Sequence, residues 1–348
     1  MSFLQKIAVG LAIADHVVEV VELTFDGKPK IRARGRVDIE QGVVVRGRIQ
    51  DQKKLADFVK KAFDAASPTP IKRGAVVVGL PEPQTYIYIF KTAAKTDDIV
   101  AAEIASNIPI DKDDLTYAWR VMNEAEGMRH ILAVAASRKA VEEWRVFFES
   151  LGLEVDFFDI EVLAIFRNVF REFPKEPVCI LDIGAATTAI SIFADHGLAY
   201  TRSVYIAGAH ITQDIAISLK ISVSDAETKK KSVGLGDHGE PIFFALVRAL
   251  EPIVRETRGA IEHFARTSGR YVTELVLVGG SSRMPGLDEY LATNLGIPVK
   301  VAGAPETEVE AVGFALRALE NRWSKLDPAI PASFTASTPH SFWGVFGR

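Results

Sequence analysis

The sequence predicts an α/β fold made of two similar halves, and three observations support this prediction. Short β-branched runs alternate with segments of helical spacing along the 348 residues. A hairpin-like segment at 11–18 matches a second one at 181–188 without gaps, and each opens an α/β half. Late in the chain, a strand-like run ends in Gly279-Gly280 and passes into a helix-like segment. Two such halves that face each other leave a cleft, which is a usual place for a ligand.

Composition excludes several classes of protein. Lys plus Arg number 41 and Asp plus Glu number 45, so the net charge of −4 gives no electrostatic reason to bind nucleic acid. The single cysteine, Cys179, has no partner for an intramolecular disulfide. The apolar runs fall short of the roughly 20 residues that a membrane-spanning helix needs. We therefore expect a cytoplasmic protein that has neither a membrane span nor a secretory signal.

Hydrophobic spacing predicts the elements of the first half. Runs rich in β-formers at 7–11 and 17–23 flank the polar pair Asp15-His16, and this pattern predicts a hairpin. The other elements expected in this half are a strand at 30–37, a helix at 51–66, a strand at 74–80 and a helix at 157–170. Residues 85–152 have the order strand, helix, strand, strand, helix, which indicates a compact module inserted into the larger pattern.

The second half begins again with strands. The elements expected there are strands at 178–183, 187–193, 198–205 and 274–278, and helical segments at 212–220, 242–264, 286–295 and 309–319. Thr212 is the expected N-cap of its helix, and Pro252 predicts a kink or a fresh start. From Lys325 onward, Pro, Ser and Thr predict a disordered end, with a short interfacial or partner-binding peptide at 341–348 as the alternative.

The second hairpin has the chemistry of a phosphate-binding loop. Gly184 lets backbone N–H groups approach an anion closely, and Thr187 and Thr188 add hydroxyl donors. Asp182 stands at the end of the strand, where it can hold a hydrated Mg²⁺ ion on a phosphate. The plain alternative is a sheet edge without ligand. Because the motif recurs at the head of a second half, we favour phosphate binding.

The first hairpin lacks these features. Ala12 stands where the second copy has Asp182, and Ala14 stands where it has Gly184. A methyl group cannot bind or activate a metal-bound water. The two hairpins therefore predict one phosphate-binding half and one half that has lost this chemistry.

Two further segments are candidates for the nucleoside part of a nucleotide. Gly279-Gly280-Ser281 and Arg283 follow a strand and precede a helix, and the glycines permit close approach of a base or ribose. Glu227 and Lys230 lie three residues apart on an expected helix, so they share a face that can bracket a ribose and base. The alternatives are a tight strand-to-helix turn and a solvated, charged helix end.

Together these residues resemble the actin/Hsp70-type nucleotide-binding superfamily and, within it, the PilM family of bacterial type IV pilus assembly proteins, relatives of FtsA. The resemblance covers about residues 5–320. The motifs that carry it are Gly10-Leu11 with Val21-Glu22-Leu23, Gly47-x-Ile49-x-Asp51, Glu103 with Ile108-Pro109, Glu149-x-Leu151-Gly152-Leu153, Leu181-Asp182-Ile183-Gly184, and Gly279-Gly280.

The resemblance implies an actin-like, two-lobed fold with an inserted strand-helix-strand-strand subdomain of type 1C. Its boundaries here are 1–84 for the first part of subdomain 1A, 85–152 for 1C, 153–176 for the return to 1A, 177–303 for the second lobe (2A and 2B), 304–322 for a C-terminal helix and 323–348 for a tail. It also implies binding of ATP or ADP with Mg²⁺. The residues implied in nucleotide binding are Asp182, Gly184, Thr187, Gly208, Glu227, Lys230, Gly279, Gly280, Ser281 and Arg283, with Ala209 in place of a second family glycine.

One departure from the family changes the expected function. The first phosphate loop of the family has an acidic residue, a glycine, a Ser or Thr and a later Lys. This chain has Ala12, Ala14, Asp15, His16, Val17 and Glu19 in those places. Since Asp15 and Glu19 are expected to repel a polyphosphate, we expect weakened ATP binding and weak or absent hydrolysis.

The resemblance also implies partners. Family members bind the N-terminal segment of the inner-membrane protein PilN in a groove between 1A and 1C, which recruits them to the membrane, and they act with other pilus assembly proteins. The sequence leaves self-association open, and it does not place the contact residues. Three alternatives remain: an FtsA-like cell-division protein, a type II secretion relative, and a small-molecule kinase of the same superfamily.

Overall fold

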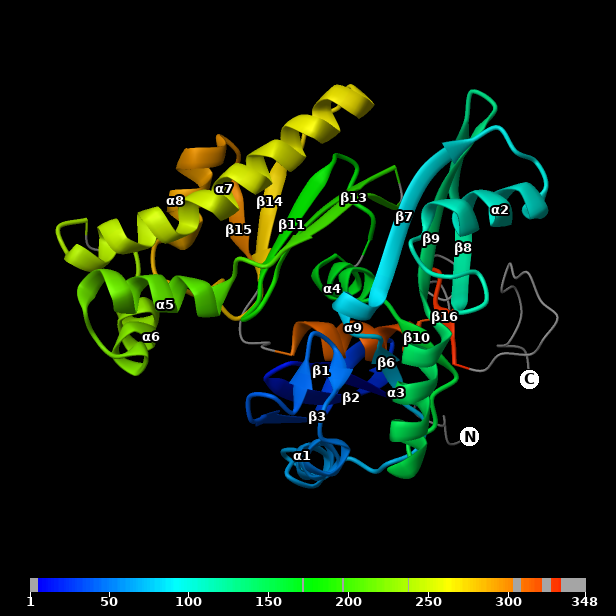
Figure 1. Cartoon of the computed structure of the whole chain (residues 1–348), viewed down its shortest axis with the longest axis horizontal. Helices are drawn as coiled ribbons and strands as arrows, with labels where there is room; N and C mark the ends of the chain where they lie inside the picture. Colours follow the sequence, from blue (N-terminus) through cyan, green and yellow to red (C-terminus); the bar gives the residue numbers. More distant parts are fainter. Residues whose placement is uncertain are drawn as a thin grey trace. The chain divides into compact units, whose positions relative to one another are not determined.

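The computed structural model describes residues 6–170, 172–195, 197–236, 238–302, 308–320 and 327–332. The chain divides into two compact units. Unit 1 consists of Met1–Arg171 and Glu308–Arg348, and unit 2 of Glu172–Thr307 (Figure 1). Within the described ranges, no helix is both long and apolar enough to cross a membrane.

Unit 1 is built on a six-stranded sheet with the strand order β16-β10-β6-β1-β2-β3. Its strands are β1 (Lys6–Ala14), β2 (Val17–Asp26), β3 (Lys28–Asp38), β6 (Val77–Gly79), β10 (Phe157–Asp159) and β16 (Ile330–Pro331). β1 and β2 pair antiparallel up to Ala14↔Val17, so Asp15 and His16 form the turn. This confirms the predicted hairpin.

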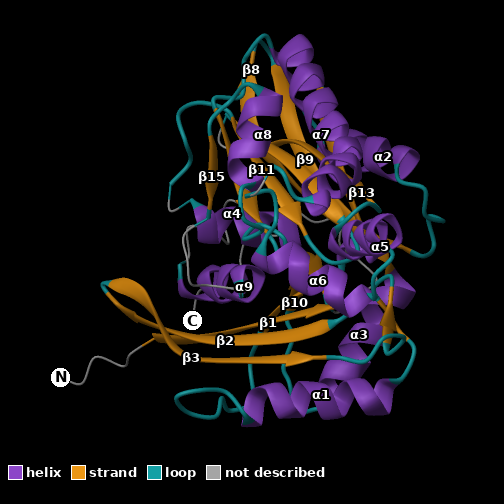
Figure 2. Cartoon of the chain, turned by 90° about the vertical axis from the view of Figure 1, so that its left-hand side faces the viewer, coloured by secondary structure: helices purple, strands orange, loops and turns teal. Residues whose placement is uncertain are grey.

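Two helices cover the faces of this sheet (Figure 2). On one face, α9 (Val309–Leu319) packs on an apolar cluster that includes Ala8, Ala12 and Val21. A Cβ atom on Gly10 would overlap the carbonyl oxygen of Ala311, so the helix backbone lies directly on β1. The other face contacts α1 (Gln52–Asp64). α4 (Glu161–Val169) packs on α9 from its far side.

Residues 85–152 form a separate three-stranded sheet within unit 1. The elements are β7 (Thr85–Thr92), α2 (Asp97–Asn107), β8 (Leu115–Ala125), β9 (Met128–Ser137) and α3 (Arg138–Ser150), in the predicted order. β9 lies between β7 and β8, and α2 covers one face (Figure 1) through Val100 and Ile104. A small hairpin, β4 (Val44–Val45) and β5 (Arg48–Ile49), and the short helix η1 (Glu82–Gln84) also lie in the described part of this unit.

Unit 2 has a five-stranded sheet with the order β13-β12-β11-β14-β15. Its elements are β11 (Val178–Ile183), β12 (Thr188–Ala194), β13 (Gly197–Val204), α5 (Gly208–Leu219), α6 (Val223–Ser232), α7 (Pro241–Ser268), β14 (Glu274–Val278), α8 (Leu287–Leu295) and β15 (Val299–Val301). Its core combines sheet residues such as Leu181 with Ile211 of α5 and Leu246 of α7.

The two sheets confirm the internal repeat. Leu11 lies in β1, which pairs antiparallel with β2 and parallel with β6. Leu181 lies in β11, which pairs antiparallel with β12 and parallel with β14. The aligned residues thus occupy equivalent central strands of two sheets that have the same local topology.

Three predictions about elements were wrong, and one of the two alternatives predicted for Pro252 is excluded. Phe157–Asp159 is a strand rather than the start of a helix, because it pairs with both β6 and β16. α5 begins at Gly208, so Thr212 lies one turn inside the helix rather than at its N-cap, with its Oγ1 2.8 Å from the Gly208 carbonyl oxygen. α7 runs through Pro252 without a fresh start. The predicted disordered end is wrong for residues 327–332, and residues 341–348 lie outside the described part of the chain.

A buried group of four charges explains the order of residues 327–332. Asp159, at the end of β10, pairs with Arg167 of α4 and with Arg317 of α9 (Nη1–Oδ1 2.9 Å). Arg167 also pairs with Asp327, whose carbonyl accepts a hydrogen bond from Arg317 (2.7 Å). We call these four residues the ion cluster. It holds β16 beside β10, where Ile330 is fully buried.

The ion cluster predicts a large effect of one substitution. Asp327→Ala leaves Arg167 buried without one of its two carboxylates, so we expect the free energy of unfolding of unit 1 to fall by about 3–5 kcal/mol. Urea denaturation of the whole chain measures this. Asp64→Ala is the matched control, because it removes the exposed carboxylate that pairs with Arg73 and should cost at most about 1 kcal/mol. Equal losses in both variants would contradict a supporting role for the cluster.

Candidate functional site

Three chain segments of unit 2 meet at one edge of its sheet. β11 and β14 are parallel, so the loops after Ile183 and Val278 leave the sheet side by side. The N–H of Ser281 donates to the Ile183 carbonyl (3.2 Å), which joins these two loops. The N–H of Gly208, at the start of α5, donates to the Gly184 carbonyl (2.9 Å). The structure therefore brings the predicted phosphate loop, Gly208 and the Gly-Gly turn together.

Glycine is required where Gly279 passes the end of β11. Its φ of +85° lies in the left-handed region, and a Cβ there would overlap Oδ1 of Asp182. Gly280 is different, because a Cβ at this position would meet nothing within 4 Å. The backbone at Gly280 is therefore open to approach. Ser281 is nearly buried, and its Oγ lies against Gly208.

Lys230 and Glu227 of α6 point toward the start of α5. Lys230 is only 4% exposed, and its Nζ donates to the Gly208 carbonyl (3.0 Å) and to Thr212 Oγ1 (2.7 Å). It also pairs with Glu227 (2.6 Å), which accepts a further hydrogen bond from Thr212. The predicted pair thus shares one network with Gly208.

The same network shifts the acidity of Glu227. Partial burial by itself would raise the pKa of Glu227, but hydrogen bonds from Lys230, Thr212 and Lys231 outweigh it and lower the pKa to about 2. The carboxylate therefore stays ionised at neutral pH. Sequence reasoning missed Thr212 as a member of this network. Thr212 could have been found from its position four residues after Gly208, because residues one helical turn apart lie on the same side of a helix.

The other predicted residues have different surroundings. Thr187 is partly exposed, and its carbonyl accepts from the Gly184 N–H (3.0 Å). Arg283 is exposed. Thr188 is buried and donates its hydroxyl hydrogen to the Ile206 carbonyl (2.6 Å). The expectation that Thr188 donates to a ligand was therefore wrong, because its one donor hydrogen is already used.

The first hairpin is organised differently. Ala12, at the position of Asp182, is 6% exposed and belongs to the apolar cluster under α9. Asp15 accepts hydrogen bonds from the backbone N–H groups of Arg46 (2.8 Å) and Gly47 (3.0 Å). Glu19 pairs with Arg36 on the neighbouring strand. Both carboxylates that we expected to repel a polyphosphate thus have partners within unit 1, which weakens that repulsion.

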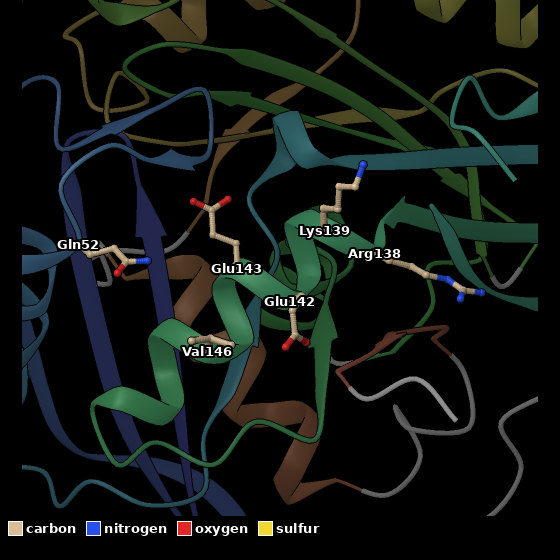
Figure 3. Close-up of a pocket in the computed structure, with 6 residues that line it drawn as sticks. All are labelled: Gln52, Arg138, Lys139, Glu142, Glu143 and Val146. Carbon is tan, nitrogen blue, oxygen red and sulfur yellow. The ribbon is translucent and has the colours of Figure 1, made fainter. Parts of the chain in front are cut away.

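Unit 1 also has an open pocket beside α3 (Figure 3). Its volume is about 550 Å³ and its lining residues are Gln52, Arg138, Lys139, Glu142, Glu143 and Val146. Gln52 is the first residue of α1 and points toward α3 (Figure 3). Val146 is 47% exposed, which is high for a valine on a helix that packs on its other side. This pocket could not be predicted from sequence patterns, because its two walls, at Gln52 and at 138–146, are far apart in the chain.

The pKa of Glu227 predicts a pH-dependent stability. It is lower in the folded chain than the ordinary value of 4.5, so the ionised carboxylate stabilises unit 2 above that pH and loses this effect as the pH falls toward 2. We expect Glu227→Gln to lower the thermal unfolding midpoint at neutral pH. The difference in midpoint from wild type should narrow below pH 4.5, the ordinary pKa of a glutamate. Glu262→Gln, which removes an exposed partner of Arg266, is the control and should show little change at any pH. A gap for Glu227→Gln that is constant with pH contradicts the network.

Comparison with known proteins agrees with this architecture. A family model described as type IV pilus assembly protein PilM matches residues 10–319. FtsA of Pseudomonas aeruginosa is 33% identical over 181 residues, which cover 44% of this chain and 43% of FtsA. The chain therefore matches less than half of the length of that curated relative.

Two solved structures show the fold. A PilM-PilN type IV pilus biogenesis complex has a TM-score of 0.75 at 20% identity and covers 90% of this chain and 98% of the other. MreB 5 of Spiroplasma citri bound to AMPPNP has a TM-score of 0.57 at 15% identity, with 92% and 97% covered. The predicted actin-like α/β fold is confirmed. Because the family match extends over nearly the whole chain, the chain belongs to the family of the type IV pilus assembly protein PilM.

Proposed function

We propose that this chain is a cytoplasmic nucleotide-binding scaffold of type IV pilus assembly that hydrolyses ATP weakly or not at all. One observation carries the proposal. In unit 2 the loops after β11 and β14 meet the start of α5, whereas the equivalent hairpin of unit 1 has Ala12 packed in an apolar cluster. One half thus offers a complete set of ligand-binding loops, and the other uses the same hairpin for packing.

The residues of unit 2 fit a nucleotide with Mg²⁺. The carboxylate of Asp182 lies near the end of β11, where it can hold a water of the ion. The loop at 185–187 would offer backbone N–H groups to phosphate oxygens. The open backbone at Gly280 suits a ribose or base, with Ser281 and Arg283 beside it. Glu227 and Lys230 lie next to Gly208. Mg²⁺ would neutralise phosphate charge there.

Hydrolysis is expected to be poor because the first hairpin lacks an acidic residue at position 12. A methyl group at Ala12 cannot orient or activate a water. We therefore assign a regulatory or structural role to the nucleotide.

The partner we propose is the N-terminal segment of an inner-membrane PilN-type protein. A solved structure that resembles this chain is itself a complex of PilM with PilN. We place the segment in the pocket between the start of α1 and α3, with 85–152 as the inserted subdomain 1C, 1–84 and 153–176 as 1A, and 177–303 as the second lobe. Exposed Val146 would contact an apolar side chain of the segment. Such docking would recruit the chain to the inner membrane, where other pilus assembly proteins are its further partners.

An FtsA-like role in cell division is the second candidate, because of the 33% identity to FtsA over 181 residues. The two candidates differ in their partner. Binding of a PilN-type segment favours pilus assembly, whereas self-association into filaments without such binding favours the FtsA-like role.

Calorimetry with ATP and ADP tests the nucleotide site. We expect both nucleotides to bind with Mg²⁺, phosphate release to stay at background, and Asp182→Ala to weaken binding by about tenfold or more. Asp195→Ala, an exposed aspartate of the same unit, is the control and should bind normally. Clear Mg²⁺-dependent phosphate release that Asp182→Ala abolishes would refute the scaffold proposal.

Titration with a PilN-type N-terminal peptide tests the pocket. Val146→Asp puts a charge where we expect an apolar contact, so peptide affinity should fall by about tenfold or more. Val223→Asp changes an equally exposed valine of unit 2 and should leave peptide binding intact. If both variants bind like wild type, the segment docks elsewhere.

A further inference from the structure

The turn between β4 and β5 receives its hydrogen bonds from distant parts of unit 1. Arg46 and Gly47 both have positive φ values, 50° and 70°. Their adjacent N–H groups both donate to the carboxylate of Asp15, at 2.8 and 3.0 Å. A carboxylate that accepts two backbone N–H groups makes strong, charge-assisted hydrogen bonds. The turn of the first hairpin is therefore fixed to this second turn.

The carbonyl groups of the same turn are fixed as well. The Arg46 carbonyl accepts a hydrogen bond from Gln84 Nε2 (2.9 Å), and the Gly47 carbonyl accepts one from Trp144 Nε1 (3.1 Å). A Cβ on Gly47 would lie 2.6 Å from Cβ of Pro81, so the turn also packs closely on the chain before η1. All four backbone polar groups of this two-residue turn thus have partners on other elements.

Trp144 connects the turn to the pocket. It is 1% exposed, and its ring packs against Phe147 and Phe148 of the same helix. It is therefore immobilised on the buried side of α3. Val146 and the other α3 residues that line the pocket lie on the opposite, exposed side. A shift of the turn would move Trp144 and, with it, the pocket wall.

We infer that Asp15 is a positioning residue for the pocket, acting through the Arg46–Gly47 turn and Trp144. This inference rests on the proposed docking of a partner segment beside α3. It also gives the first hairpin a role other than phosphate binding, because the residue at its tip holds a protein backbone in place of a ligand.

Asp15→Asn is the direct test. Asparagine has the same shape, but it offers one acceptor oxygen and turns an NH₂ group toward one of the two N–H donors. We expect the affinity for a PilN-type peptide to fall about tenfold, with nucleotide affinity unchanged. Trp144→Phe removes only the indole donor and should lower peptide affinity similarly. Since both residues act through one turn, the double variant should lose less than the product of the two effects.

Asp57→Asn on the exposed side of α1 is the matched control, and it should leave both affinities unchanged. If Asp15→Asn instead raises nucleotide affinity and leaves peptide affinity unchanged, Asp15 acts only by repelling phosphate and the inference is overturned. Additive losses in the double variant, or equal behaviour of Asp15→Asn and Asp57→Asn, also overturn it.

Hydrogen exchange separates this inference from the proposed function. We expect the amides of α3 to exchange faster in Asp15→Asn than in wild type and in Asp57→Asn. If wild type binds no PilN-type peptide, the proposed docking fails, while faster exchange in α3 still supports the role of Asp15 as a positioning residue. Unchanged exchange in α3 contradicts the inference whether or not the peptide binds.

Discussion

Unit 1 depends on the close packing of α9 on its six-stranded sheet. The chain leaves this unit after Arg171 and returns at Glu308. Among the helices of unit 1 that lie in the described residues, α9 is therefore the last to be synthesised. Its backbone lies on Gly10, and its Arg317 joins Asp159 and Asp327 in the ion cluster. Buried charges are tolerated only when each has a partner, so the cluster fixes the mutual positions of β10, α4, α9 and β16. Unit 1 is thus completed by residues that lie far beyond its other segments in the chain.

The two hairpins show how one topology supports two kinds of chemistry. At the aligned position, Asp182 lies against Gly279 at the edge of the second sheet, whereas Ala12 lies under a helix in the first. The two positions differ because different segments pack against the two strands. In unit 2 a glycine turn passes the strand end, and in unit 1 the backbone of α9 occupies the corresponding face. The same β-hairpin therefore serves a ligand-binding edge in one unit and a packed core in the other.

Local patterns predicted the elements well where a single periodicity ran through them. The helix at 309–319, the hairpin around Asp15 and the order of elements in 85–152 are examples. Sequence reasoning failed where the deciding partner is distant. Phe157–Asp159 is too short for an alternation of buried and exposed residues to reveal a strand in the sequence. It is a strand because β6 and β16 pair with it on either side. The region around Asp327 has the composition of a loop, and it is ordered because Arg167, 160 residues away, pairs with it.

The residues of the candidate site likewise include some that could be predicted from local sequence and some that depend on distant partners. Asp182, Gly279 and Lys230 could be chosen from motif and spacing, and Gly208 from the family resemblance. The fold brings them to one edge of the unit 2 sheet. The roles of Asp15 and Trp144 could not be predicted. Asp15 accepts hydrogen bonds from backbone N–H groups about 30 residues away, and Trp144 donates to a backbone carbonyl of the same turn, about 100 residues away. Since nearly every residue has the same backbone groups, the identities of Arg46 and Gly47 do not indicate these hydrogen bonds.

The burial of Ala12 limits what a change of sequence can restore. An aspartate at this position would replace a member of the apolar cluster that also holds Ala8, Ala311 and Ala315. It would lie opposite the buried carboxylate of Glu19 on β2, and burial of its charge would cost several kcal/mol. An engineer who wanted to return catalytic metal chemistry to this hairpin would have to redesign the helix above it at the same time. The surroundings of Ala12 therefore oppose a return of the aspartate, and reversing the change one residue at a time would pass through a destabilised intermediate.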